Sequence, residues 1–157
     1  MTRNLLALLL ALLACACTAP GSLVGGSEAD LRAKMGAPKG EYSNADGSRT
    51  LAYPTGPLGT DTYMAEVAPG GQVRAVHNAL KDETFQRINP GMTRDDVLRL
   101  IGPPRDSAKF AALNQVSWEY YFQDTWGYRA LFFVNFDPNG IVVSKFTRRL
   151  DYDRDRR

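Results

Sequence analysis

Residues 91–104 read GMTRDDVLRLIGPP and contain the signals of a short, well-delimited helix. Thr93 is a residue type that caps the first amide groups of a helix, and the two aspartates after it complement the helix dipole. Val97 and Ile101 lie one helical turn apart and so share one face. Gly102 and the two prolines that follow it cannot continue the helix. The segment therefore predicts a capped helix with one buried face.

A fainter copy of this segment occurs earlier in the chain. Residues 26–38 read GSEADLRAKMGAP, again with a serine cap and a glycine-proline stop. Met35 and Ile101, the residues before the two stops, are 66 positions apart, and the turns at Pro69 and Pro138 are 69 positions apart. Helix, strand, strand, turn and strand recur in one order. The sequence therefore predicts two tandem units, each too small to be stable alone, that pack as one body.

Apolar alternation and turn residues predict the strands of both units. In the first unit they are expected at 49–53, 62–67 and 72–76, and in the second at 116–122, 128–136 and 141–146. A short helix is expected at 82–88. The predicted fold class is α+β, with two tandem small units that each combine helix with a three-stranded antiparallel sheet.

The first fourteen residues predict a secretory signal peptide. Met1 to Asn4 supplies a positive charge, and Leu5 to Leu13 is a Leu/Ala run. This run is too short to span a bilayer, which needs about 20 apolar residues. It ends in Leu-Leu-Ala before Cys15, which resembles the lipobox of bacterial lipoproteins. The expected anchor is a covalent N-terminal lipid on Cys15.

Two other interpretations of this region stay open. Cys17 is a weaker alternative acceptor, because no leucine stands three positions before it, and an ordinary signal peptide with a nearby cysteine would carry no lipid. Neither cysteine is followed by aspartate, which favours sorting to the outer membrane. The expected organisation is a signal peptide at 1–14, a lipidated start and tether at 15–26, a first unit at 27–79, a second unit at 80–150 and a charged tail at 151–157.

The composition argues against several functions. The 157 residues carry a net charge of only +2, which gives no indication of nucleic-acid binding. His77 is the sole histidine, and both cysteines precede the folded part, so a catalytic triad, a zinc site and a disulfide lack their components. Asp95 and Asp96 are adjacent on a helix and do not face each other, so we expect them to balance the helix dipole. We expect no catalytic residue, no metal and no cofactor.

The second unit also carries a pattern that runs from its helix into its strands. Its members are Ile88, Gly91, Met92, Thr93, Val97, Ile101, Gly102, Pro104, Trp118, Tyr120, Phe132, Phe136, Asp137 and Gly140. In order and spacing this pattern resembles the BamE family, also called SmpA/OmlA, over roughly residues 85–146. The first unit resembles it only weakly. The resemblance implies two helices on a three-stranded antiparallel sheet, and the same unit in tandem is the architecture of secreted β-lactamase-inhibitor proteins.

The resemblance also implies a function. BamE proteins are non-enzymatic outer-membrane lipoproteins that face the periplasm, bind other envelope proteins and support the β-barrel assembly machine. This chain departs from the family by carrying two units. The alternative is an inhibitor or adaptor that clasps a soluble periplasmic enzyme between its two units, and an envelope enzyme is a more distant third.

The aromatic residues in and beside the loop at 123–127, between two predicted strands, suggest a contact surface. Strand alternation places Trp118 and Tyr120 on one face, where we expect them in the core. Trp126 falls in a loop, so it is a candidate contact for a partner or lipid headgroups, unless it folds back over the sheet. Tyr128 and Arg129 follow it, and the basic residue favours an acidic partner or anionic phospholipid.

Overall fold

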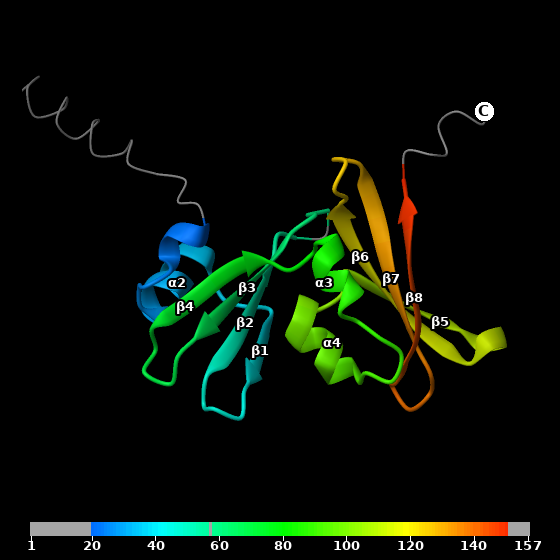
Figure 1. Ribbon diagram of the computed structural model, residues 1–157, viewed down its shortest axis with the longest axis horizontal. Helices are drawn as coiled ribbons and strands as arrows, with labels where there is room; N and C mark the ends of the chain where they lie inside the picture. The colour runs from blue at the N-terminus through cyan, green and yellow to red at the C-terminus, as the bar shows by residue number, and fades with distance from the viewer. Residues whose placement is uncertain (1–19, 57, 151–157) are drawn as a thin grey trace, which may run out of the picture.

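The structure is a computed structural model that describes residues 20–56 and 58–150 (Figure 1). In chain order its elements are the 3₁₀ helix η2 (Pro20–Leu23), α2 (Glu28–Met35), β1 (Gly40–Ser43), β2 (Arg49–Pro54), β3 (Thr62–Val67), β4 (Val73–Asn78), α3 (Asp82–Gln86), α4 (Arg94–Ile101), β5 (Asp106–Phe110), the 3₁₀ helix η3 (Ala111–Leu113), β6 (Gln115–Gln123), β7 (Arg129–Phe136) and β8 (Val142–Arg149). The strands form two antiparallel sheets with the orders β1-β2-β3-β4 and β5-β6-β7-β8. The class is α+β, as predicted.

Each sheet has four strands, where the sequence predicted three. The missed strands are β1 and β5, which each follow the stop of a helix and lie at the edge of a sheet. All residues of β5 are exposed, and β1 has no fully buried residue. An edge strand over solvent needs no apolar alternation, so its sequence carries little strand signal. The other predicted ends differ from the observed bounds by at most three residues.

The tether predicted at residues 15–26 is wrong for residues 20–26. Leu23 is 5% exposed in the core of the first unit, and the amide of Gly25 donates to the carbonyl of Val73 at 2.8 Å. Residues 20–26 are therefore the folded start of the first unit. The predicted signal peptide, both cysteines and the tail at 151–157 lie outside the described residues.

The tandem repeat is visible in matching hydrogen bonds. Ser27 and Thr93, 66 positions apart, each form a capping box with an aspartate three residues later. The same two residues each bridge to the start of their unit's last strand, Ser27 to Gln72 and Thr93 to Ile141. A register shift follows in the pairing of the last two strands of each sheet. The two units are thus built alike in detail, although their sequences differ.

The units stack as alternating layers of helix and sheet (Figure 1). α2 packs on one face of the first sheet, in a core that includes Leu31 and Leu51. α3 and α4 lie between the two sheets. Their core joins Tyr120 and other residues of the second sheet to Ala52 and Met64 of the first. The middle helical layer is therefore shared by both sheets.

Gly102 brings the end of α4 against the first sheet. It has φ +75° and ψ −171°, a conformation that glycine adopts without strain. A Cβ at this position would lie 2.9 Å from Cγ2 of Thr62 and 3.1 Å from Cβ of Ala52. On the other side, the buried Tyr120 hydroxyl donates to the Gly102 carbonyl at 3.1 Å. This turn therefore contacts both sheets and requires glycine.

Candidate functional site

The β6–β7 hairpin carries an exposed aromatic tip. Trp126 is 77% exposed and Tyr128 is 48% exposed. The alternative in which Trp126 folds back over the sheet is therefore wrong. Tryptophan and tyrosine are frequent anchors of protein interfaces, so this tip is a candidate binding surface.

Asp124 holds the tip in one conformation. Its Oδ1 accepts the backbone amides of Trp126 and Tyr128, both at 2.9 Å, and its Oδ2 accepts Nε of Arg149 at 2.5 Å. Burial acts to raise the pKa of Asp124, but the hydrogen bond from Tyr128 and the contacts with Arg149 and Trp126 outweigh it and lower that pKa. The carboxylate is therefore ionised at neutral pH and fixes the turn.

A second aspartate joins the tip to the helical layer. Oδ2 of Asp82, in α3, accepts the backbone amide of Thr125 at 3.2 Å and its hydroxyl at 2.7 Å. The turn of the hairpin is thus held by Asp124 within the hairpin and by Asp82 in α3. A rigid turn loses little conformational entropy when a partner binds, so Trp126 is presented in advance.

The arginines near the tip differ in whether they already contact other side chains. The guanidinium of Arg149 is bound to Asp124 and lies 4.9 Å from the ring centroid of Tyr128. Arg148 lies over Phe133, at 5.6 Å from its ring centroid. Arg129 is exposed at the start of β7, directly after the turn. The structure thus places Trp126, Tyr128 and Arg129 together on one hairpin.

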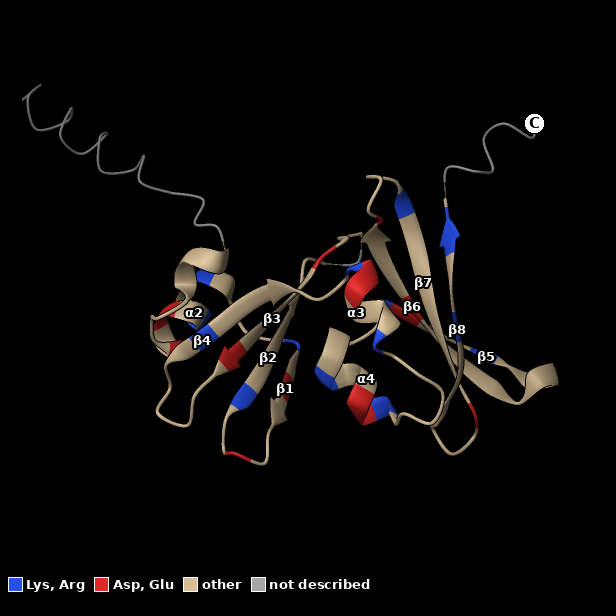
Figure 2. Cartoon of the chain, in the orientation of Figure 1, with Lys and Arg blue, Asp and Glu red and all other residues tan. Residues whose placement is uncertain are grey.

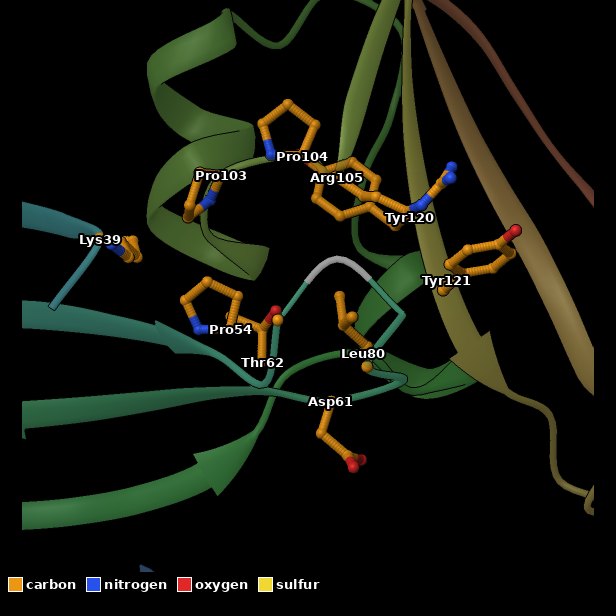
Figure 3. A pocket seen from close by; sticks show the side chains of 12 residues that line it. Lys39, Pro54, Asp61, Thr62, Leu80, Pro103, Pro104, Arg105, Tyr120 and Tyr121 are labelled. Carbon is orange, nitrogen blue, oxygen red and sulfur yellow. The ribbon is translucent and has the colours of Figure 1, made fainter. Parts of the chain in front are cut away.

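Both units line a cavity of about 240 Å³ at their junction (Figure 3). Its walls are Lys39, Pro54, Gly56, Gly59, Asp61, Thr62, Leu80, Pro103, Pro104, Arg105, Tyr120 and Tyr121. The Arg105 guanidinium stacks 4.2 Å from the ring centroid of Tyr121. The walls contain no histidine, cysteine or serine that could act as a nucleophile or its base. The cavity is a hollow left where the units meet, small beside the pockets that hold drug-sized ligands.

The polar residues considered for chemistry have structural positions. Asp96 accepts the backbone amide of Thr93 at 2.8 Å and its hydroxyl at 2.7 Å, so it belongs to the helix cap. Asp95 and His77 are exposed. Within residues 20–56 and 58–150, no three His, Cys, Asp or Glu residues are placed to hold a metal ion.

The pattern residues of the second unit form its scaffold. Val97 and Ile101 are fully buried under α4, and Tyr120 is 1% exposed. Trp118 is partly buried, with its ring centroid 4.6 Å from that of Phe136. Gly91 precedes α4, and Gly140 lies in the turn between β7 and β8. Both have positive φ. Met92 packs partly buried against the same core, and Pro104 follows the helix stop.

Residues 77–145 match the family model of the outer membrane protein assembly factor BamE domain. This stretch of the chain is therefore similar to a BamE domain. This match confirms the resemblance predicted from the pattern between Ile88 and Gly140. The matched residues include α3, α4 and the β6–β7 hairpin with its exposed Trp126 tip.

Two solved structures match parts of this chain. A candidate beta-lactamase inhibitor protein from Streptococcus mutans is 15% identical, with 78% of this chain and 82% of that chain covered and a TM-score of 0.33. An extracellular protein containing a SCP domain from Bacillus anthracis is 16% identical, with 79% and 43% covered and a TM-score of 0.33. Neither likeness is close enough to assign a function. No curated protein matches the sequence.

Some residues of the site were not predicted from the sequence. Asp124 stands two positions before Trp126, which is the spacing of an aspartate that accepts amides within its own turn. The role of Asp124 in the turn could therefore have been predicted from this spacing. The contact of Asp82 with Thr125 spans 43 positions, and no local pattern indicates it.

Proposed function

We propose that this chain is a non-enzymatic outer-membrane lipoprotein that supports the assembly of outer-membrane proteins by binding other envelope proteins. The BamE domain at 77–145 carries the proposal. In it, the lipid on Cys15 anchors the chain, residues 27–79 and 80–150 act as the two units and face the periplasm, and the Trp126 tip contacts a protein of the assembly machine. Among the described residues, no helix is long and apolar enough to cross a membrane.

The Trp126 tip is the proposed contact because it combines exposure with rigidity. A tryptophan that is 77% exposed on a fixed turn can bury a large apolar area without first being ordered. Tyr128 extends this area, and Arg129 adds a positive charge that suits an acidic partner or anionic phospholipid headgroups. The same residues would therefore serve a protein partner close to the membrane surface.

Depletion of the chain in its native cells tests the function. We expect the amount of folded β-barrel protein in outer-membrane fractions to fall and to recover with the wild-type gene. Trp126→Ala should restore it poorly, because loss of an interface anchor costs about 2 kcal/mol of binding free energy. Leu113→Ala is the matched control, since Leu113 is 67% exposed on another turn of the same unit.

Two results would contradict the proposal. Unchanged barrel levels after depletion would exclude the assembly function. Equal rescue by Trp126→Ala and Leu113→Ala would exclude the hairpin tip as the contact while leaving the assembly function open.

The lipid anchor is tested separately with labelled palmitate. We expect Cys15→Ser to abolish labelling and to leave unprocessed precursor at the inner membrane, whereas Cys17→Ser should label as the wild type does. Labelling that persists in Cys15→Ser and is lost in Cys17→Ser would assign the lipid to Cys17.

The alternative of a periplasmic enzyme inhibitor has less support. A clasp between the units would need open space there, but α3 and α4 fill the region between the two sheets. The cavity of about 240 Å³ at the junction is too small to receive an element of another protein.

A further inference from the structure

β8 forms one edge of the second sheet, in the strand order β5-β6-β7-β8 (Figure 1). The amide of Leu150 donates to the carbonyl of Arg129 at 3.0 Å, so these two residues form a hydrogen-bonded pair in line with β7 and β8. Such pairs alternate along an antiparallel ladder. The even-numbered residues from 144 to 148 therefore direct their backbone groups to β7, whereas Lys145, Thr147 and Arg149 direct theirs to the outer edge.

The beginning of this outer edge is already covered. The amide of Val142 donates to the carbonyl of Met92 at 2.8 Å, and the amide of Gly91 donates to the carbonyl of Val142 at 2.9 Å. Among residues 20–56 and 58–150, no other backbone segment hydrogen-bonds to the outer edge of β8, and no helix or further strand runs along it. The outward backbone groups of residues 145–149 are therefore open to an added strand.

The last strand of the first unit has the same start but a shorter edge. Val73, which lies 69 positions before Val142, exchanges the same two backbone hydrogen bonds with residues 25–26. β4 ends at Asn78, the residue that corresponds to Thr147, and the chain then turns into α3. β8 continues for two more residues beyond that position. The second unit therefore offers the longer open edge.

The cations that could shield this edge are bound elsewhere. Charged side chains on an edge strand, lysine above all, hinder its pairing with another strand. β8 carries Lys145, Arg148 and Arg149 and no acidic residue (Figure 2). The Lys145 amine donates to the carbonyl of Phe85, near the end of α3, at 2.8 Å. Arg148 packs over a phenylalanine ring, and Arg149 is bound at the hairpin tip. The three side chains therefore leave the outer backbone groups accessible.

The two faces of β8 differ in polarity. Phe146 is the one apolar side chain of residues 144–149, is 50% exposed and stacks on Phe133 of β7 with ring centroids 4.6 Å apart. Lys145 and Thr147 lie on the opposite face. A strand added to this edge would set an apolar side chain beside Phe146 and polar side chains beside Lys145 and Thr147. Alternation of apolar and polar residues is also the pattern of transmembrane β-strands.

We propose that the outer edge of β8 binds an extended segment of an unfolded β-barrel protein, which adds to the second sheet as a fifth strand. Backbone hydrogen bonds select a segment by its extended conformation more than by its sequence, so one edge can receive strands of many client proteins. The inference rests on the proposed function and names the client of that function and the place that holds it.

A second copy of this chain is a poorer occupant of the edge. Two copies of β8 that pair antiparallel about Thr147 would overlap most fully, over residues 145–149 of each copy. That register sets Lys145 opposite Arg149 of the other copy at both ends. Like charges directly opposite each other destabilise a strand pair. A client segment with neutral or acidic residues at these positions carries no such cost.

Amide hydrogen exchange of the full mature chain, followed by NMR, tests this inference. The probe is a peptide of about ten residues with the alternating sequence of a transmembrane β-strand. We expect a saturating amount of it to slow exchange at the amides of Lys145, Thr147 and Arg149 by at least about tenfold. The amides of Phe146 and Arg148 already donate to β7 and should change little. A peptide of the same composition without alternation should slow exchange less.

A proline at Thr147 separates the backbone from the side chain. Thr147→Pro removes one outer amide and keeps the ladder with β7, because proline is tolerated at an edge position whose amide faces solvent. It should weaken peptide binding by about tenfold in a fluorescence-anisotropy titration. Thr147→Val is the matched control, since it keeps the amide, and it should bind as the wild type does. Equal binding by both variants would overturn the inference. If Thr147→Pro fails to fold, the exchange pattern of the wild type decides the question.

Photocrosslinking in the native cells identifies the occupant. With Thr147 replaced by p-benzoylphenylalanine, we expect adducts with newly synthesised β-barrel protein. The inference is overturned by adducts only with a second copy or with a subunit of the assembly machine, and by unchanged exchange at the three outer amides. Barrel-protein levels after depletion report on the proposed function independently. Reduced levels without slowed exchange would remove this inference and keep the assembly function, whereas normal levels with slowed exchange would remove the assembly function and its client.

Discussion

Single glycines decide how the units meet. Gly36 and Gly102 end α2 and α4 with nearly the same backbone, at φ +80° and ψ −162° and at φ +75° and ψ −171°. This region of φ and ψ is almost restricted to glycine. The two positions differ in their surroundings, because a Cβ at Gly36 would meet no atom within 4 Å, whereas one at Gly102 would meet Thr62 and Ala52.

Alanine at these two glycines separates backbone strain from packing at the junction. Gly36→Ala should lower the free energy of unfolding by about 1–3 kcal/mol through strain alone. Gly102→Ala should lower it by at least about 1 kcal/mol more, because the first sheet must also move away from the new methyl group. Urea unfolding of both variants measures the difference. Equal losses would mean that the end of α4 does not touch the first sheet.

At the scale of elements, the two helices share a cap but differ in their faces. Both capping boxes pair a hydroxyl with an aspartate three residues later, and the hydrogen bonds from Thr93 lower the pKa of Asp96. α4 buries Val97 and Ile101, whereas α2 buries only Leu31. The stronger apolar face of α4 agrees with its place between two sheets.

The cap of α4 gives a prediction with a defined pH dependence. Thr93→Ala should lower the free energy of unfolding by about 1 kcal/mol at pH 7. Since the folded state lowers the pKa of Asp96, the contribution of that carboxylate is present above its unfolded value, about 3.9, and is lost as the pH falls below it. The gap between Thr93→Ala and the wild type should therefore narrow below about pH 4.

Denaturant unfolding across this pH range measures the effect. Asp95→Asn is the matched control for Asp96→Asn, because Asp95 lies in the same turn but makes no capping bond. Asp96→Asn should cost more than Asp95→Asn at pH 7. A gap between Thr93→Ala and the wild type that stays constant down to pH 3 would refute the role of Asp96 in the cap.

Local signals predicted the elements better than their assembly. The cap at Thr93 and the stop at Gly102 are chemical features of a few neighbouring residues, so the sequence predicts α4 to within a residue of its observed bounds. β1 and β5 were missed because exposed edge strands need no apolar pattern. The tip at Trp126 was predicted from its place between two strands, but its fixation by Asp82 depends on a contact between distant segments.

At the scale of the whole molecule, the shared helical layer should make the two units unfold together. The core of α3 and α4 includes Ala52 and Met64 of the first sheet as well as the inner face of the second. Loss of the first unit would therefore expose one side of this layer to water. Two bodies that share a buried layer are expected to unfold in a single transition.

Leu31→Ala tests this coupling. Leu31 is fully buried in the core between α2 and the first sheet, which includes no residue of the second unit, and its truncation should cost about 2–5 kcal/mol. The only two tryptophans, Trp118 and Trp126, lie in the second unit, so their fluorescence reports on that unit alone. In urea, we expect the fluorescence midpoint of Leu31→Ala to fall as far as the midpoint from far-ultraviolet circular dichroism. An unchanged fluorescence midpoint beside an early loss of circular dichroism would mean that the second unit is stable without the first.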